Sequence, residues 1–119
     1  MKEMRCSTFW ANIYIAGPVP QIEQTCREWT LKGACVTVTP TNYVYTMGEE
    51  SGAIIGLIHY PRFALDQTVV PKMETKEKIL EEAKELGFLL LEKCCQGSFT
   101  IVTPDDTIFF SRREGDEKK

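Results

Sequence analysis

The stretch from residue 34 to residue 63, ACVTVTPTNYVYTMGEESGAIIGLIHYPRF, is rich in β-branched and aromatic side chains. Turn-forming residues divide it into three predicted strands, at 36–39, 42–46 and 53–60. It therefore reads as a meander rather than as strands separated by helices, which predicts a mostly antiparallel sheet. Its Thr, Tyr and Arg side chains suit a small anionic or aromatic ligand, and it contains no set of residues for catalysis. The stretch accordingly favours a binding protein over an enzyme.

The flanking sequence predicts two helices and three further strands. Apolar residues recur at helical spacing in both helical segments, and alternation with β-rich composition marks the strands. The predicted order is β-α-β-β-β-α-β-β, an α+β fold with two helices and a mostly antiparallel sheet of about six strands. The expected bounds are 12–16 for the first strand, about 20–32 and 74–95 for the helices, and 99–102 and 107–111 for the last two strands.

The size and charge of the chain limit its organisation and its partners. A chain of 119 residues suits one domain. We expect residues 1–113 to form a single ligand-binding domain and the charged residues 114–119 to form a disordered tail. The net charge of −3 argues against a nucleic-acid polymer or a membrane surface as partner. No apolar run has the length of a transmembrane helix, and the N-terminus lacks a signal-peptide pattern, so a cytoplasmic location is expected.

The cysteines do not form a metal-binding or disulfide pattern. Their number, five, is odd, no C-x-x-C motif is present, and the single histidine is not near any of them. We therefore expect reduced thiols, no metal site and no cofactor.

Arginines that follow aromatic residues are the first candidates for ligand binding. Arg62 follows Tyr60-Pro61, and Arg112 and Arg113 follow a pair of phenylalanines. Guanidinium groups bind phosphate through two hydrogen bonds and stack on purine rings, which suits a nucleotide-like ligand. Thr37 and Thr39 could add hydroxyl donors for ribose or phosphate. The alternative for each is an ordinary exposed residue at a strand end or on a solvated strand face.

Other polar residues give weaker indications. His59 is the only histidine and lies in an apolar strand, so a structural role is favoured over catalysis. Glu49 and Glu50 are adjacent in a predicted loop, where carboxylates are usually solvated, although one of them could meet a ribose hydroxyl.

One short segment suggests an enzyme instead. IYIAGP, at 13–18, resembles the opening strand of nucleoside 2-deoxyribosyltransferases, which have a parallel α/β fold. The catalytic glutamate that this resemblance implies has no clear counterpart in the chain. A nucleoside-processing enzyme of this type is therefore kept as the alternative function.

Several segments taken in order resemble a phage family, the first-described Thoeris anti-defence proteins. The resemblance covers most of residues 12–113 and depends on order and spacing rather than on one motif. Proteins of this family sequester cyclic ADP-ribose isomers made by bacterial TIR-domain proteins and do not cleave them. The segments are IYIAG at 13–17, CR at 26–27, CVTVTPT at 35–41, YVYT at 43–46, GEE at 48–50, YPRF at 60–63 and SRR at 111–113.

This resemblance implies a sponge for a small cyclic nucleotide signal, with no catalytic residue. It also implies self-association as a dimer or hexamer, with signal pockets at the contacts between subunits. By analogy, Arg27 and one of Arg112 or Arg113 would lie near phosphate or adenine. Phe88 or Phe99 would stack on the base.

A second anion site is expected at the YPRF tip, formed by Arg62 together with His59. The sponge is the preferred function, in the cytoplasm of a bacterial host during infection. A third hypothesis is a structural or interaction protein in which Arg27, Arg62 and Arg112 have no ligand.

Overall fold

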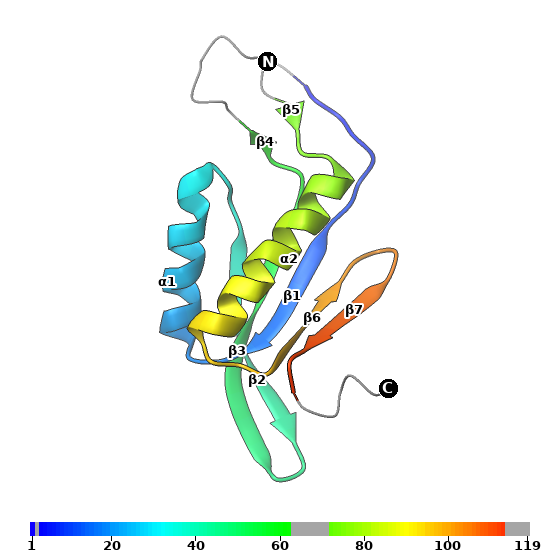
Figure 1. Cartoon of the computed structure of the whole chain (residues 1–119). Helices are drawn as coiled ribbons and strands as arrows, with labels where there is room; N and C mark the ends of the chain where they lie inside the picture. Colours follow the sequence, from blue (N-terminus) through cyan, green and yellow to red (C-terminus); the bar gives the residue numbers. More distant parts are fainter. Residues whose placement is uncertain (2, 63–71, 114–119) are drawn as a thin grey trace.

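The computed structural model describes residue 1, residues 3–62 and residues 72–113 (Figure 1). Phe63 of the YPRF tip and the predicted tail at 114–119 lie outside the described residues. None of the described helices is both long and apolar enough to cross a membrane. The elements are β1 (Ala11–Ala16), α1 (Val19–Trp29) continued by a 3-10 turn (Thr30–Lys32), β2 (Thr37–Tyr45), β3 (Gly48–Leu57), β4 (Pro61–Arg62), β5 (Lys72–Met73), α2 (Lys76–Lys93), β6 (Ser98–Val102) and β7 (Thr107–Ser111).

The main sheet has five strands in the order β2-β3-β1-β6-β7, and every neighbouring pair is antiparallel. Helix α1 connects β1 to β2, and in the sheet β3 lies between these two strands. Helix α2 lies in the connection from β3 to β6, and in the sheet β1 lies between those two strands. The short strands β4 and β5 pair separately. The predicted α+β class, with two helices and a mostly antiparallel sheet, is confirmed.

The sheet has five strands where about six were predicted, because β2 runs unbroken through Pro40, where the sequence suggested a tight turn at 40–41. Proline lacks a backbone N–H and is tolerated on an edge strand, where one side of the backbone has no neighbour. β2 is such an edge strand. Glu49 and Glu50, expected in a loop, belong to β3 and pair with Val44 and Tyr43.

One face of the sheet carries both helices and holds the core (Figure 1). Alternate residues of β1, namely Ala11, Ile13 and Ile15, point to this face and are buried, as are Ile55 of β3 and Ile101 of β6. The helices contribute the apolar stripes expected from the sequence. Burying each large aliphatic side chain contributes about 1.5–3 kcal/mol, so this face supplies most of the stability. The buried helix residues include Ile22, Cys26 and Trp29 of α1 and Ile79, Ala83, Leu86 and Leu90 of α2.

The other face of the sheet is not covered by a helix within the described residues, and we call it the open face (Figure 1). Its side chains come from the remaining alternate positions, so they are more polar and only partly buried. The strand register places Thr39, Ile54, Tyr14, Thr100 and Phe109 in one row across all five strands. The open face therefore presents hydroxyl and aromatic groups rather than a packed core.

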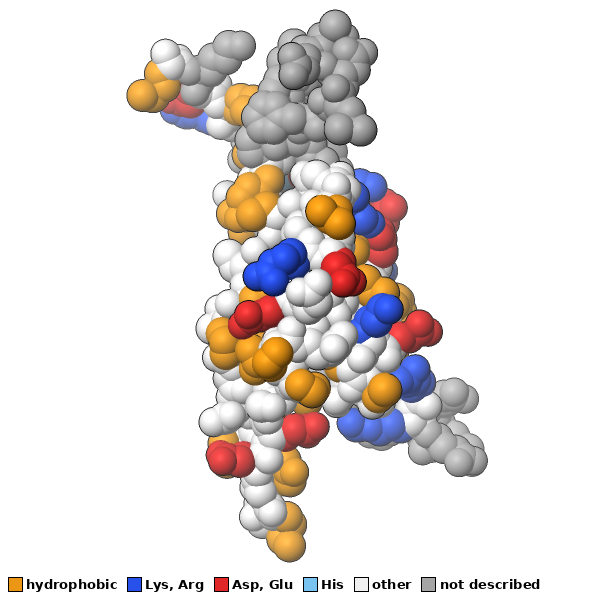
Figure 2. Space-filling model, turned by 90° about the vertical axis from the view of Figure 1, so that its left-hand side faces the viewer, with side chains coloured by type: hydrophobic (Ala, Val, Ile, Leu, Met, Phe, Trp, Pro, Cys, Tyr) orange, Lys and Arg blue, Asp and Glu red, His pale blue; other side chains and the backbone are white. Residues whose placement is uncertain are grey.

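The β2–β3 hairpin extends beyond the rest of the sheet, at the lower end of the molecule in Figure 1. Hydrophobic side chains remain exposed at its tip, which Figure 2 shows at the bottom of the molecule. Val44, Tyr45 and Met47 are the exposed residues, and Met47 has 90% of its surface exposed. The base of this hairpin meets the open face and forms one wall of the site described below.

Candidate functional site

The residues expected to form one ligand site are distributed over two sides of the sheet. Thr37 and Thr39 point to the open face, as their pairing with Gly56 and Ile54 requires. Arg27 is exposed on α1, on the helix-covered side. The structure therefore does not bring the predicted guanidinium and hydroxyl groups into one pocket.

The two predicted stacking aromatics belong to the core or lie at its border. The ring of Phe99 is buried, with 2% of its surface exposed, and it stacks on Phe110 with ring centroids 4.9 Å apart. Phe88 meets Phe99 edge-on at 5.2 Å and is partly exposed. Phe99 packs against Gly87, where an added Cβ would lie only 2.7 Å from its Cζ atom. In this structure the ring of Phe99 is not accessible to a ligand.

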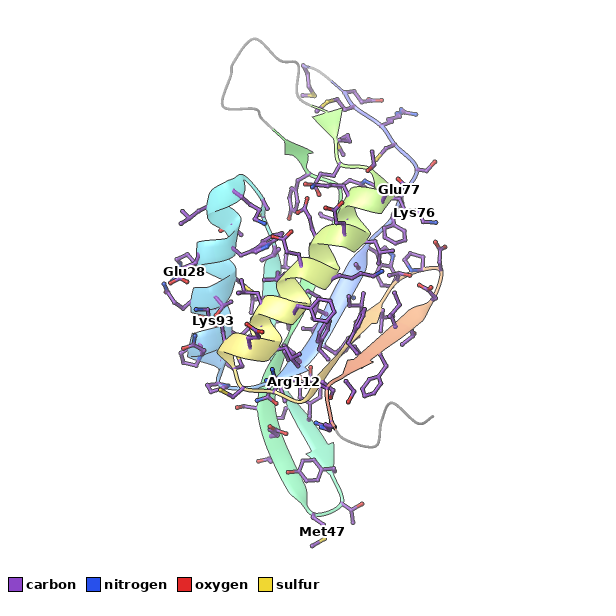
Figure 3. The ribbon with its side chains drawn as sticks, viewed as in Figure 1. Glu28, Met47, Lys76, Glu77, Lys93 and Arg112 are labelled. Carbon is purple, nitrogen blue, oxygen red and sulfur yellow. The ribbon has the colours of Figure 1, made fainter. Side chains whose placement is uncertain are left out.

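Arg112 holds the end of a helix rather than facing a pocket. Its Nε donates to the backbone oxygen of Gln96 at 2.9 Å, and its Nη2 donates to that of Leu91 at 3.3 Å. Its backbone N–H also donates to Gly97 O. Figure 3 shows Arg112 where the C-terminal end of α2 meets the last strands. A cation at this position satisfies carbonyl groups that a helix end leaves unpaired.

His59 has both ring nitrogens engaged by the backbone. Its Nε2 accepts from the N–H of Phe9 at 2.8 Å, so Nδ1 carries the proton and donates to Glu74 O at 2.6 Å. The ring thus ties the start of β1 to the segments that follow β3 and precede α2. With both nitrogens occupied, it has no donor left for an anion. The other half of the expected second anion site, the side chain of Arg62, lies outside the described residues.

A different group of side chains converges where the open face meets the base of the β2–β3 hairpin. They surround a hollow of about 170 Å³, which we call the open-face hollow. It is bounded by strands from both halves of the sheet and by the α2–β6 connection. Its functional side chains are those of Tyr14, Tyr43, Glu50, Gln96, Ser98, Thr100 and Arg113.

Tyr43 is a fixed wall of this hollow. Its hydroxyl donates to the backbone oxygen of Ala53 at 3.0 Å, and its ring lies against Gly52, where an added Cβ would be 2.5 Å from Cε2. Burial raises the pKa of the Tyr43 hydroxyl above its ordinary value. The ring pairs across the hairpin with Glu50, whose carboxylate lies on the same face.

The connection after α2 shapes the opposite wall. Cys95 adopts a left-handed conformation, with φ of 53°, and the N–H groups of Cys95 and Gln96 donate to Glu92 O and Leu91 O. These are the hydrogen bonds of a Schellman motif, which ends the helix and turns the chain. Gly97 lets the Arg113 side chain pack closely, because a Cβ at residue 97 would lie 2.5 Å from its Nε. This close approach brings Arg113 to the hollow.

The hollow combines an acid, a guanidinium, hydroxyl groups and two tyrosine rings. Glu50 and Arg113 are exposed, and no ion pair holds either of them among the described residues. Such a site can bind a ligand that carries both a cation and a carboxylate, with an aromatic surface for a planar base. No cluster of metal-binding side chains occurs in the part of the chain that the structure describes.

Sequence reasoning named two residues that line this hollow, Phe99 and Arg113, among the ligand-binding residues. It described Glu50 as a solvated carboxylate that could meet a ribose hydroxyl. Tyr14, Tyr43 and Gln96 were missed as site residues. Alternation alone places Tyr14 and Tyr43 on one face of their strands, but the order of the strands is needed to bring them together. Only knowledge that β3 lies between β1 and β2 in the sheet could have shown that these residues form one site.

The interleaved split β-α-β connections and the order of the first four strands define a ferredoxin-like α+β protein, to which β7 adds a fifth strand. Two solved structures share this fold over nearly the whole chain. One is a phage SAM lyase in the apo state, with a TM-score of 0.65 and 17% sequence identity over 95% of this chain and 97% of that chain. The other is a phage SAM lyase in complex with S-methyl-5'-thioadenosine, with a TM-score of 0.60 and 16% identity over 98% of each chain. No family model and no curated protein matches the sequence.

These comparisons overturn three expectations from the sequence. The chain has the fold of structures solved as SAM lyases, so the resemblance to Thoeris anti-defence proteins and the sponge function that it implied are wrong. The expectation that the chain is not an enzyme is contradicted as well. The parallel α/β fold of a nucleoside 2-deoxyribosyltransferase is also excluded, because every strand pair of the main sheet is antiparallel.

Proposed function

We propose that this protein binds an adenosine-containing small molecule in the open-face hollow and cleaves S-adenosylmethionine (SAM). The observation that carries the proposal is the likeness in fold, over nearly full length, to two phage SAM lyase structures, one of them holding S-methyl-5'-thioadenosine. The hollow supports it, because its charges and rings match a ligand that joins an amino acid, a sulfonium and an adenosine. We propose a phage origin and a cytoplasmic site of action on the same ground.

The two molecules define which bond breaks. S-Methyl-5'-thioadenosine keeps the adenosyl group, the sulfur and the methyl group of SAM. The broken bond therefore joins the sulfur to Cγ of the amino-acid part, and sulfur leaves as a neutral thioether with the bonding electron pair. In a lyase no water enters. We propose that the carboxylate oxygen of the substrate itself attacks Cγ and closes a four-carbon lactone. The positive charge of the sulfonium and the negative charge of the carboxylate disappear together, so the atoms and the net charge balance.

This reaction requires positioning more than proton transfer. We assign to Arg113 the task of orienting the substrate carboxylate toward Cγ, and to Glu50 contact with the ammonium or the sulfonium. The Tyr14 and Tyr43 rings offer surfaces for the sulfonium or the adenine. Thr39 shares a cross-strand row with Tyr14, and Thr37 lies further along the same face. Ribose contacts from these two threonines remain a prediction.

The size of the hollow suggests that a second copy completes the site. Ligand pockets usually enclose about 300–1,000 Å³, whereas this hollow holds about 170 Å³. No helix covers the open face around it in the part of the chain that the structure describes. We therefore retain self-association from the sequence prediction, with the open face packed against another copy, and the number of copies is to be measured by native mass spectrometry.

Incubation of the protein with SAM in water labelled with oxygen-18 tests the proposal. We expect equal amounts of S-methyl-5'-thioadenosine and an unlabelled four-carbon lactone by mass spectrometry. Intact SAM after prolonged incubation would refute the proposed activity. Label incorporated during cleavage, after correction for slow hydrolysis of free lactone, would refute the intramolecular route.

Variants at the hollow test the placement of the site. Glu50→Gln and Arg113→Gln should each lower kcat/KM at least about 100-fold, because each removes a charge that faces the substrate. Glu49→Gln is the matched control for Glu50, since it removes the neighbouring exposed carboxylate from the opposite face of the strand. Equal losses in Glu49→Gln and Glu50→Gln would place the site elsewhere.

A further inference from the structure

A second recess lies on the opposite side of the sheet, between α1 and the edge strand β2, and we call it the α1–β2 groove. Its volume is about 400 Å³. It contains Arg27, which was expected from the sequence to bind a ligand and does not line the open-face hollow. The groove is lined by Glu23, Cys26, Arg27, Thr30, Ala34, Cys35, Val36 and Val38.

The floor of the groove is apolar. Cys26 is buried, with 3% of its surface exposed, and burial raises the pKa of its thiol to about 11, so the thiol is neutral at pH 7. Val36 and Val38 are half-buried against the edge of the core. Among the described residues α1 packs against β3 more than against β2, so the half-buried floor can receive an apolar group from a ligand.

The rim of the groove carries one negative and one positive side chain. Glu23 and Arg27 are four residues apart on α1 and therefore lie on the same side of the helix. No ion pair involves either of them among the described residues, and the Arg27 guanidinium makes only a long hydrogen bond, 3.3 Å, to Gln24. Thr30 donates its hydroxyl proton to Arg27 O at 2.7 Å, so its oxygen remains able to accept. Figure 2 shows acidic and basic side chains interspersed on this side of the molecule.

We propose that the α1–β2 groove binds a free α-amino acid with an apolar side chain. The ligand carboxylate meets Arg27, its ammonium meets Glu23 and the Thr30 oxygen, and its side chain lies on the floor formed by Cys26, Val36 and Val38. A simple anion would meet repulsion from Glu23, and a simple cation would meet repulsion from Arg27. The paired charges therefore select a zwitterion. This site is separate from the open-face hollow and does not depend on SAM cleavage.

Titration of the ¹⁵N-labelled protein with L-methionine, followed by NMR, tests the proposal. We expect shifts confined to α1 and the start of β2. Arg27→Gln and Glu23→Gln should each weaken binding at least about tenfold, because each removes a charge-assisted hydrogen bond. Glu28→Gln is the matched control on the same helix, since Glu28 does not line the groove (Figure 3). N-acetylmethionine and methionine amide, which lack one charge each, should bind more weakly by a similar factor.

The thiol of Cys35 provides a second readout that needs no enzymatic activity. Cys35 is exposed and lines the groove, so methionine should slow its alkylation, measured by mass spectrometry, while the alkylation of exposed Cys6 stays unchanged. Arg113→Gln should leave methionine binding intact. The absence of shifts at millimolar methionine would overturn the proposal, and so would shifts centred on Tyr14 and Glu50. Either outcome would leave the proposed SAM cleavage unaffected.

Discussion

The two faces of the five-stranded sheet use alternate residues of the same strands for different purposes. On β1, Ile13 and Ile15 point under the helices and are buried, whereas Asn12 and Tyr14 point to the open face and are only partly covered. Substitutions on the first face should act mainly through the free energy of unfolding. Substitutions on the second should act mainly through ligand binding. Residues of the helix-covered face therefore stabilise the fold, whereas residues of the open face can vary with the ligand that is bound.

The largest effect on stability is expected for Ile13→Ala. Ile13 is fully buried between strands β3 and β6, so truncation should leave a cavity and lower the free energy of unfolding by about 2–5 kcal/mol. Urea denaturation followed by circular dichroism measures it. Tyr14→Phe, one residue away on the open face, should change stability by less than about 0.5 kcal/mol. Equal losses in the two variants would contradict the division between the faces.

Gly52→Ala should affect both the stability of the sheet and the shape of the open-face hollow. Its added Cβ would meet the ring of Tyr43 at 2.5 Å and Cα of Ala16 at 2.8 Å, so backbone and ring must move. We expect a loss of about 1–3 kcal/mol in the free energy of unfolding, together with a displaced wall of the open-face hollow. Gly48→Ala is the control, because its added Cβ would meet only Tyr45, at 3.8 Å. A Gly52→Ala protein with unchanged stability would show that the hairpin base adapts freely.

Substitutions of the two neighbouring arginines after β7 should also differ, one acting on stability and the other on ligand binding. Arg112→Gln removes a cation that contacts two carbonyl groups at the end of α2, and should lower the free energy of unfolding by about 1 kcal/mol. Arg113→Gln should leave stability nearly unchanged and act on ligand binding. Thermal unfolding compares the two variants. The reverse order of stabilities would contradict the roles assigned to them.

The smallest effect concerns the contact between α1 and α2. Lys32 pairs with Glu85, and this hydrogen bond lowers the pKa of the Glu85 carboxyl below its ordinary value of 4.5, against a smaller opposing effect of burial. The hydrogen bond from Trp29 lowers this pKa by a still smaller amount. The stabilisation is therefore complete above pH 4.5 and is lost as the pH falls through the lowered pKa. Because the pair is largely exposed, it should contribute less than about 1 kcal/mol. Glu85→Gln should remove this part of the acid sensitivity in unfolding measured from pH 6 to pH 3, whereas Glu92→Gln should retain it.

Helices and strands that are marked by a local hydrophobic pattern were predictable from the sequence. The stripe of Ile22, Cys26 and Trp29 correctly indicated the buried face of α1, and alternation indicated β1. Pro40 led to the wrong prediction of a turn at 40–41. A proline is tolerated within a strand that lies at the edge of a sheet, and the position of a strand in the sheet cannot be seen from the local sequence. Strand pairing also decided the place of Glu50, which local composition assigned to a loop.

The candidate site was less predictable because its residues are joined only through the fold. Tyr14, Glu50 and Arg113 are far apart in the sequence, and they meet because β1 lies beside β3 and because Gly97 admits the Arg113 side chain. The two arginines that follow β7 look alike in sequence, yet one holds a helix end and the other borders the hollow. The aromatic rings of Phe88 and Phe99 suited a nucleotide base in chemistry, but Phe99 is buried in the core and Phe88 packs edge-on against it.

Pro40 has a consequence for how the molecule can associate. The exposed edge of a sheet is a template on which a strand from another molecule can add, and a row of such additions produces fibrils. Because residue 40 has no N–H to offer, a strand approaching β2 would lose one hydrogen bond in the middle of its ladder. The proline thus discourages the uncontrolled growth of sheets at this edge. It makes contact through side chains on the faces of the sheet the easier route to an assembly of limited size.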